Sequence, residues 1–299
     1  YKLKIFDNIL LRLMNNDEEL KKIQNKSNSK ENIQLINEDN NFFIQKSWSD
    51  VERGVLSIRK QIDFDEISIS NLIIKSPKVF KTQIIDSVSF EAKMEYIEGY
   101  SGSDISLIGT RDVSHNLRDA LSMIINRNFE HSIIKSISND IFITKIDQIL
   151  SFISTDKILE IKLKKLRNEF LKDKFYDIPC GKCHGDLTLS NIIVSRTGSL
   201  NLIDFLPNFI ESPLWDVVKI FQDLKYGWSY RDLCGPEKET AKIFFLNCIP
   251  SQLVLYENVF KRQILLLDSL NLARLCPYIN DQKTRLWVIK SFDDSLSKF

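Results

Sequence analysis

The sequence predicts an α+β fold, with a small antiparallel sheet in its amino-terminal part and a larger, mainly helical carboxyl-terminal part. Up to about residue 98, short apolar segments alternate with polar turns at the spacing of hairpins. Beyond that point, apolar residues recur at helical spacing. A glycine-containing stretch at residues 98–102 separates the two patterns and marks a hinge. We therefore expect two domains, residues 1–98 and residues 99–299.

The amino-terminal domain is predicted to contain one helix among its strands. The expected strands span residues 20–24, 33–36, 41–46, 79–85 and 89–97. Between residues 49 and 61, the apolar residues from Val51 to Ile58 recur at near-helical spacing, and Ser49 and Asp50 precede them as N-cap residues. A helix there would pack its apolar face on the sheet.

The carboxyl-terminal domain is predicted to be helical at residues 112–127 and 157–174 and again from Trp215 onward. Residues 183–205 between them have a strand-loop-strand pattern. In the second helix the basic residues form a solvated face opposite the apolar one. Because that helix lacks interleaved aromatic residues, we expect no nucleic-acid partner.

The composition is that of a globular chain with balanced charge. Among its 299 residues, 43% are hydrophobic and 27% are charged, and the net charge is +1. Such a chain can bury a sizeable core, and its charge gives no reason to expect a polyanionic partner. The most apolar stretch, residues 243–256, is interrupted by polar residues and a proline, so we expect no membrane association and a cytoplasmic location.

The five cysteines, an odd number in a long chain, are expected to be free thiols. Cys180, Cys183 and His184 spell C-x-x-C-H, the pattern of covalent haem attachment. That chemistry implies export, and no signal peptide precedes it here, so we interpret the match as accidental. A structural zinc site needs four ligands, and no second C-x-x-C accompanies this pair.

The strongest pattern in the sequence is H-G-D-x-x-x-x-N at residues 184–191, which contains Asp186 and Asn191. Two apolar segments joined by a turn follow it, and the second ends in Asp204. Four fixed positions of this kind arise by chance in about one chain of this length in several hundred. The other interpretation is a polar loop whose Asp and Asn cap turns.

This pattern resembles the catalytic and metal-binding loops of the aminoglycoside phosphotransferase, choline kinase and protein kinase superfamily. The resemblance implies a two-lobed, protein-kinase-like fold with a small antiparallel-sheet N-lobe and a larger, mainly helical C-lobe. It also implies ATP-dependent transfer of phosphate to a hydroxyl group of a small molecule, with Mg²⁺. It extends from residue 20 to about residue 230, and the remaining residues match only in being helical.

The resemblance gives each polar residue of the motif a role. Phosphoryl transfer needs a carboxylate beside the attacking hydroxyl and oxygen ligands for magnesium. Asp186 would be the catalytic base or the residue that orients the hydroxyl. Asn191 and Asp204 would hold the metal, and His184 would support the loop.

The same resemblance implies a nucleotide site in the amino-terminal domain. Lys46, at the end of an apolar strand, would bind the ATP phosphates, and Glu52 on the next helix would hold Lys46. Taken alone, either residue is an ordinary surface charge. Glu52 also follows Lys46 more closely than in many relatives.

Adenine contacts and a phosphate loop are expected at two further segments. Residues 93–99 resemble the kinase hinge, in which Met94 would be the gatekeeper and the main chain of Glu95 and Ile97 would bind the base; an ordinary edge strand is the alternative. The loop at residues 26–32 contains no glycine, so Ser29 and Asn32 are the phosphate contacts expected there, with Ser27 beside them. ATP is the expected donor, and GTP stays open.

The acceptor is expected to be an amino alcohol or a sugar-like metabolite. Four aromatic residues lie where the resemblance implies an acceptor side, and their faces would suit an ammonium group, although such residues are more often core: Trp215, Tyr226, Trp228 and Tyr230. Acidic residues suited to a polycation are few: Glu211, Asp216 and Asp223. Asp216 would also open a helix and buttress the catalytic loop. An aminoglycoside-modifying kinase and a catalytically silent nucleotide-binding protein are the alternative functions.

Overall fold

The computed structural model describes residues 32–69, 72–153, 156–279 and 281–299, and the chain divides into two compact units. The described residues of the first unit are 32–66, Lys75–Glu98 and Asn201–Pro207. The second unit contains Ile67–Ile74, Gly99–Leu200 and Asn208–Phe299. The strand predicted at residues 20–24, together with Ser27 and Ser29, lies outside the described residues.

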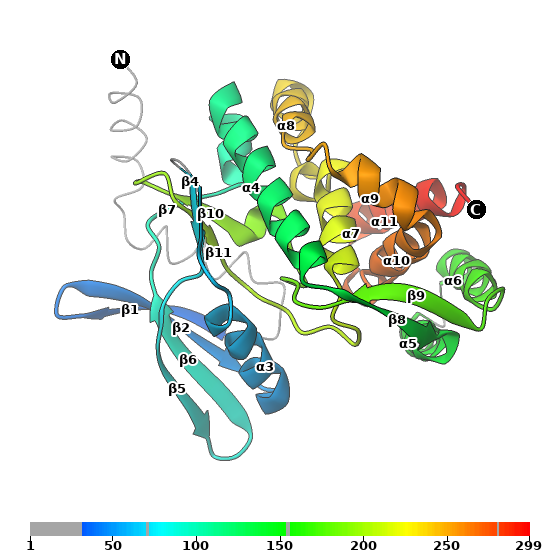
Figure 1. The fold of residues 1–299 in the computed structure, drawn as a ribbon, viewed down its shortest axis with the longest axis horizontal. Helices are drawn as coiled ribbons and strands as arrows, with labels where there is room; N and C mark the ends of the chain where they lie inside the picture. The colour runs from blue at the N-terminus through cyan, green and yellow to red at the C-terminus, as the bar shows by residue number, and fades with distance from the viewer. Residues whose placement is uncertain (1–31, 70–71, 154–155, 280) are drawn as a thin grey trace. The chain divides into compact units, whose positions relative to one another are not determined.

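The first unit is a four-stranded antiparallel sheet in the order β1-β2-β6-β5, with the helix α3 on one face (Figure 1). Its elements are β1 (Asn32–Glu38), β2 (Asn41–Trp48), α3 (Val51–Ile62), β5 (Val79–Ile85) and β6 (Ser89–Glu95). A two-residue turn joins β1 to β2, and both of its residues, Asp39 and Asn40, have positive φ angles of 50° and 63°. Asp and Asn tolerate this conformation, which matches the twist of the paired strands.

The helix α3 begins where the sequence predicts it. The Asp50 side chain accepts a hydrogen bond from the Arg53 N–H at 3.0 Å, which confirms the predicted N-cap. The apolar face of the helix packs on the sheet in one buried core: Trp48, Ile58, Phe90, Ala92 and Met94. Gly54 allows the close approach, because a Cβ there would lie 2.7 Å from the Phe90 ring.

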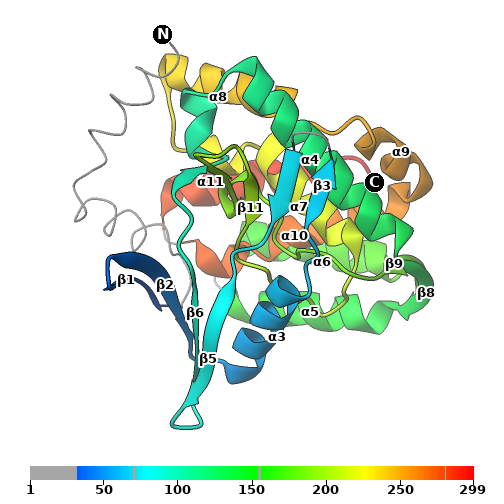
Figure 2. The same ribbon diagram turned by 60° about the vertical axis from the view of Figure 1, so that its left-hand side comes forward.

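The second unit is mainly helical (Figures 1 and 2). Its helices are α4 (Arg111–Glu130), α5 (Asn139–Phe152), α6 (Lys157–Phe170), α7 (Pro213–Leu224), α8 (Gly235–Asn247), α9 (Leu253–Val259), α10 (Lys261–Ala273) and α11 (Gln282–Leu296). Short 3₁₀ turns lie at η1 (Asp104–Leu107), η2 (Leu189–Asn191), η3 (Trp228–Tyr230) and η4 (Cys276–Tyr278).

Two small sheets accompany these helices. Their strands are β3 (Ile67–Ile69), β4 (Leu72–Lys75), β7 (Gly99–Ser101), β8 (Ile133–Ser138), β9 (Phe175–Cys180), β10 (Ile192–Ser195) and β11 (Leu200–Leu202). One sheet has the order β3-β4-β11-β10-β7, and β8 pairs with β9 in the other (Figure 2). At the end of β9 the chain enters the loop that carries the H-G-D-x-x-x-x-N pattern.

The helix α7 lies at the centre of the second unit, because every one of its residues is buried. Ser212 caps the helix by accepting from the Leu214 N–H at 3.2 Å. Pro213 occupies the first turn, where a backbone N–H has no partner within the helix, so the missing N–H of proline costs nothing there. Trp215 is fully buried, and α10 packs alongside. A helix this enclosed can place side chains with little freedom.

Within the described residues, no helix is both long and apolar enough to cross a membrane. All five cysteines are free thiols, and three of them, Cys183, Cys248 and Cys276, are buried. In the same described part of the chain, no cluster of three or more His, Cys, Asp or Glu side chains could hold a metal ion by itself.

Candidate active site

In the first unit, Lys46 and Asp204 form an ion pair. β2 places the Lys46 ammonium 2.8 Å from Asp204 Oδ1, and only 6% of Lys46 is exposed. The ammonium also lies 5.0 Å from the centre of the Trp48 ring, which is a cation–π distance. A buried ammonium held by a carboxylate at the end of a strand is a fixed positive charge that suits a phosphate.

Asp204 is held in an unusual backbone conformation. Its φ angle is +60°, a left-handed value that non-glycine residues rarely adopt and that concentrates at functional sites. Two contacts fasten the segment that follows: Lys60 of α3 donates to the Leu206 carbonyl at 2.7 Å, and Phe64, just after α3, packs against Phe205. The backbone that follows Asp204 is therefore fixed by these contacts.

Glu52 does not pair with Lys46, contrary to the prediction. It is exposed in the first turn of α3, where an acidic side chain suits the helix dipole, and no hydrogen bond or ion pair of Glu52 is found within residues 32–69, 72–153, 156–279 and 281–299. The carboxylate beside Lys46 is that of Asp204.

The expected hinge lies at the end of β6. The Met94 side chain is buried in the core between the sheet and α3, where its sulfur lies 3.5 Å from the Gln61 amide nitrogen. The Glu95 N–H donates to the Lys78 carbonyl at 2.8 Å, and the Lys78 N–H donates to the Glu95 carboxylate at 3.1 Å. Ile97 lies between β6 and β7 and is half-buried. Asn32 is exposed at the start of β1.

In the second unit, Asp186 is held from both sides. Its Oδ2 accepts from the Asn191 amide at 3.0 Å, and its Oδ1 lies 2.9 Å from the Lys219 ammonium. The Asn191 amide also donates to the Asp186 carbonyl at 2.8 Å. His184 supports the loop as predicted, because it is buried and its Nδ1 accepts from the Asp186 N–H. The carboxylate, 30% exposed, keeps access to solvent.

The helix α7 holds the backbone of this loop through two buried carboxylates. Asp216 accepts from the N–H groups of His184 and Gly185 at 2.8 Å and 2.7 Å, which confirms its predicted buttressing role. Gly185 has a φ of +89°, a value that favours glycine. About two helical turns further along, Asp223 accepts from the Leu189 N–H at 2.7 Å.

The two carboxylates Asp186 and Asp223 have opposite pKa shifts. Burial opposes ionisation of Asp186, but the charge and hydrogen bond of Lys219 and the hydrogen bond of the Asn191 amide outweigh burial, so its pKa lies below the ordinary value. Burial raises the pKa of Asp223 to about 6, although hydrogen bonds from Ser229 and Leu189 oppose the rise. Asp186 is therefore a carboxylate at neutral pH, as a hydroxyl-orienting group must be.

The donor atoms of Asn191 and Asp204 suit Mg²⁺. Asn191 uses its amide nitrogen on Asp186, which leaves its amide oxygen as an acceptor. Asp204 is 41% exposed, and in the described part of the chain its Oδ2 has no hydrogen-bond partner. Amide and carboxylate oxygens are the hard ligands that Mg²⁺ prefers.

The aromatic residues expected around an acceptor do not form an open cage. Trp215 is fully buried, and the Arg231 guanidinium lies 3.8 Å from the centre of the Trp228 ring. The Tyr226 hydroxyl donates to Asp268, and Tyr230 packs against Phe245 in the core. Three of these residues thus have roles in packing, and the Trp228 face already carries a cation.

The acidic residues expected to suit a polycationic acceptor likewise have partners within the second unit. Asp216 and Asp223 are buried against the catalytic loop, and Glu211 accepts from the Cys183 thiol at 3.0 Å. Neither set of side chains indicates an aminoglycoside subsite.

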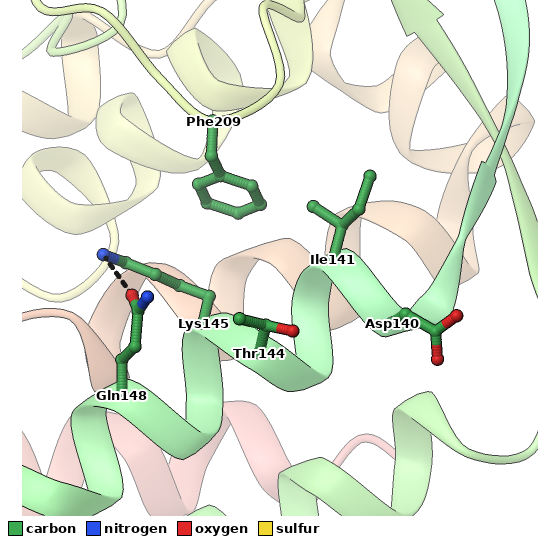
Figure 3. Close-up of a pocket in the computed structure, with 6 residues that line it drawn as sticks. All are labelled: Asp140, Ile141, Thr144, Lys145, Gln148 and Phe209. Carbon is green, nitrogen blue, oxygen red and sulfur yellow. Dashed lines mark hydrogen bonds between the residues drawn. The ribbon is translucent and has the colours of Figure 1, made fainter.

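A hollow of about 360 Å³ lies between α5 and Phe209. Figure 3 shows the Phe209 ring facing α5, with Lys145 and Gln148 toward one end and Asp140 toward the other. Burial, with a smaller effect from the charge of Arg274, lowers the pKa of Lys145. The neighbouring Asn208 donates to the Gly185 carbonyl at 3.3 Å, so the segment that carries Phe209 is tied to the catalytic loop.

Sequence reasoning missed Lys219. A lysine within an otherwise apolar helix is usually expected on the solvated face. The available signal was the spacing of Asp216, Lys219 and Asp223 by three and four residues, which places three charges on one face of a helix that is otherwise buried.

No family model matches the sequence, and no curated protein matches it. Solved structures do match. A thermostable mutant of the aminoglycoside phosphotransferase APH(4)-Ia in its apo form has a TM-score of 0.58 at 12% identity, covering 90% of this chain and 92% of that chain. A ternary complex of a thermostable mutant of that enzyme with AMP-PNP and hygromycin B has a TM-score of 0.53 at 14% identity, covering 93% and 97%.

Choline kinase LicA from Streptococcus pneumoniae matches with a TM-score of 0.53 at 14% identity, over 89% of this chain and 90% of that chain. At such identities the likeness is one of fold. The predicted α+β fold, with its small antiparallel sheet and its larger helical part, is confirmed, and this chain has the kinase-like fold that aminoglycoside phosphotransferases and choline kinase share.

Proposed function

We propose that this protein transfers the γ-phosphoryl group of ATP to a hydroxyl group of a small molecule, with Mg²⁺. The observation that carries the proposal is the arrangement at Asp186, whose carboxylate is held by the Asn191 amide while the Asn191 oxygen is left for a metal. A loop that merely caps turns has no need of such an arrangement. The kinase-like fold of the chain supports the same function.

Lys46 and Asp204 would serve the nucleotide. The Lys46 ammonium, fixed by Asp204, would bind ATP phosphate oxygens, and the main chain of Glu95 and Ile97 would bind the adenine. Asn32 and Ser29 stay proposed phosphate contacts, and no observation supports a role for Glu52.

Asn191 and Asp204 would hold Mg²⁺, which neutralises phosphate charge when bound. Free thiols and an ATP donor favour a cytoplasmic location.

Asp186 would orient the acceptor. The acceptor oxygen forms a bond to the γ-phosphorus as the bond from that phosphorus to ADP breaks, and ADP leaves. The hydroxyl proton passes to Asp186 and then to solvent. Because the pKa of Asp186 is lowered, its main contribution is to align the hydroxyl, and proton transfer comes late, as a loose transition state allows.

The acceptor is proposed to be an amino alcohol or a sugar-like metabolite. The hollow beside Phe209 offers a carboxylate at Asp140 and hydrogen-bonding groups at Thr144 and Gln148. A polycation would meet the Lys145 ammonium there, so the lining gives no support to an aminoglycoside acceptor.

A coupled assay of ATP consumption tests the function. Purified protein with ATP and Mg²⁺ is screened against pooled amino alcohols, sugars and aminoglycosides, with ³¹P NMR to identify the product. We expect ADP release that depends on one pool, on Mg²⁺ and on Asp186. If D186N releases ADP as fast as the wild type, the assignment of this site is wrong.

A further inference from the structure

Lys219 is a lysine in the most enclosed helix of the protein. It is 8% exposed, and every residue of α7 is buried. Burying an ammonium is unfavourable unless it is paired and hydrogen-bonded. Lys219 shares one face of α7 with Asp216 and Asp223, which hold the backbone of the catalytic loop. Lys219 therefore lies on the face of α7 whose other charged residues bind the loop.

The contacts of Lys219 lead to the Asp186 carboxylate. The ammonium lies 2.9 Å from Asp186 Oδ1 and donates to Gln222 Oε1 at 3.2 Å. Gln222 Oε1 also accepts from the Asn271 amide of α10 at 3.0 Å, so a second helix helps to fix the lysine. Because Asn191 binds the other carboxylate oxygen, the plane of the Asp186 carboxylate is set from two sides.

We propose that Lys219 is a positioning residue of the phosphoryl transfer reaction. It fixes the orientation of the Asp186 carboxylate toward the acceptor hydroxyl, and it balances the negative charge of Asp186. This inference rests on the proposed function. Without the ammonium, Asp186 keeps only the Asn191 contact and can rotate about its side-chain torsion, and small misplacements of a reacting group lower rates strongly.

A double-mutant cycle separates positioning from stability. The proteins are the wild type, K219M, D186N and K219M/D186N, and the readout is steady-state ADP release with the acceptor from the screen, or with water if no acceptor is found. K219M removes the ammonium and keeps the apolar stem. The matched control K225M makes the same change at the exposed C-cap residue directly after α7.

We expect K219M to lower kcat about 10- to 100-fold, the size of a lost hydrogen bond to a charged group, with KM for ATP within about threefold of the wild type. In the D186N background, K219M should change ADP release less than about twofold, because the lysine acts through Asp186. An equal loss in both backgrounds, or a K219M kcat within about twofold of the wild type, overturns the proposal.

Chemical rescue gives a second readout that a purely structural role would not change. Propylammonium replaces the atoms that K219A removes, so it should restore part of the kcat of K219A, whereas propanol and NaCl should not. Failure of propylammonium to rescue a folded K219A counts against the proposal.

A wild type that neither releases ADP nor binds MgATP overturns the proposed function and this inference together. A wild type that depends on Asp186 but not on Lys219 overturns this inference alone.

Discussion

At the scale of single residues, the site is built from charges whose partners determine what they can do. Asp186 is held by an amide and an ammonium, so it keeps its charge and its direction. Asp204 has one oxygen on Lys46 and one left over, and it sits in a strained backbone conformation. Asp186 and Asp204 therefore differ in environment, and substitutions at the two positions should affect kinetics differently.

D186N should lower kcat by about a hundred- to ten thousand-fold and leave KM for ATP within a few-fold, because orientation of the hydroxyl matters mainly during transfer. D204N should impair both, since its loss removes a metal ligand and the partner of Lys46. Steady-state kinetics with varied MgATP measure the two effects. D112N, at an exposed position of α4, is the control, and circular dichroism checks folding. A D186N enzyme with more than about a tenth of wild-type turnover would contradict the assignment.

Because we interpret the C-x-x-C-H match as accidental, we expect the protein to carry no covalent haem. His184 is buried and its Nδ1 accepts from the Asp186 N–H, while the Cys183 thiol donates to Glu211, so these groups serve the catalytic loop. The purified protein should show no Soret absorption after denaturation in acid. Absorption that survives denaturation would show covalent haem and would reverse the interpretation.

At the scale of elements, α7 organises the second unit through buried charge. Asp223 accepts from Leu189 in the catalytic loop and from the Ser229 N–H and hydroxyl in η3. It therefore ties two segments to the helix, although its burial works against the ionised form, as does the charge of Asp186. A carboxylate in this position makes stability depend on pH.

D223N should remove that dependence. The pKa of Asp223 is about 6 in the folded state and near 4 when unfolded, so between those values the folded state binds more protons and stability falls as pH rises. The free energy of unfolding of the wild type relative to D223N, measured by urea titration, should fall by about 2 kcal/mol from pH 4.5 to 7.5.

The control D281N should show almost no trend between pH 4.5 and 7.5, because hydrogen bonds from Thr284 lower the pKa of Asp281 and its unfolded pKa, near 4, also lies below this range. The stability that Asp281 contributes is present above its unfolded pKa and is lost as the pH falls. Parallel pH profiles for the wild type and D223N would show that Asp223 does not titrate in this range.

The elements that sequence reasoning predicted well are those with a local signal. The helix α3 has its cap at Asp50 and its apolar stripe, and β5 spans the predicted residues. The short strands β3, β4 and β8 were not predicted, because strands of three to six residues carry little periodicity of their own, and the helix α5 was not predicted either.

The same distinction holds for the site. The loop from His184 to Asn191 could be found because all its groups lie within eight residues. The Lys46–Asp204 contact joins residues 158 positions apart, and Lys219 reaches Asp186 from another element. Such partners depend on tertiary packing, which is why Glu52 was assigned to Lys46 in place of Asp204.

At the scale of the whole molecule, the proposed residues are divided between the two units. The first unit contains Lys46 and Asp204, and the second contains Asp186 and Asn191. Substitution of Lys46 should therefore impair nucleotide binding, whereas substitution of Asp186 should impair catalysis and leave nucleotide binding intact. Three aromatic residues expected around the acceptor are used for packing, so they do not form an acceptor cage in the second unit.

MgATP should stabilise the whole protein against heat, and this should depend on Lys46 but not on the Asp186 carboxylate. A ligand that binds only the native state adds about 2.7 kcal/mol at a concentration a hundred times its Kd, which raises the melting temperature of a chain of this size by several degrees. Differential scanning fluorimetry with millimolar ATP and Mg²⁺ measures the shift. EDTA should abolish it, K46M should lose it because the phosphates lose a buried ammonium, and D186N should keep it. If the wild type does not shift under these conditions, ATP is not its ligand, and GTP is the next donor to test.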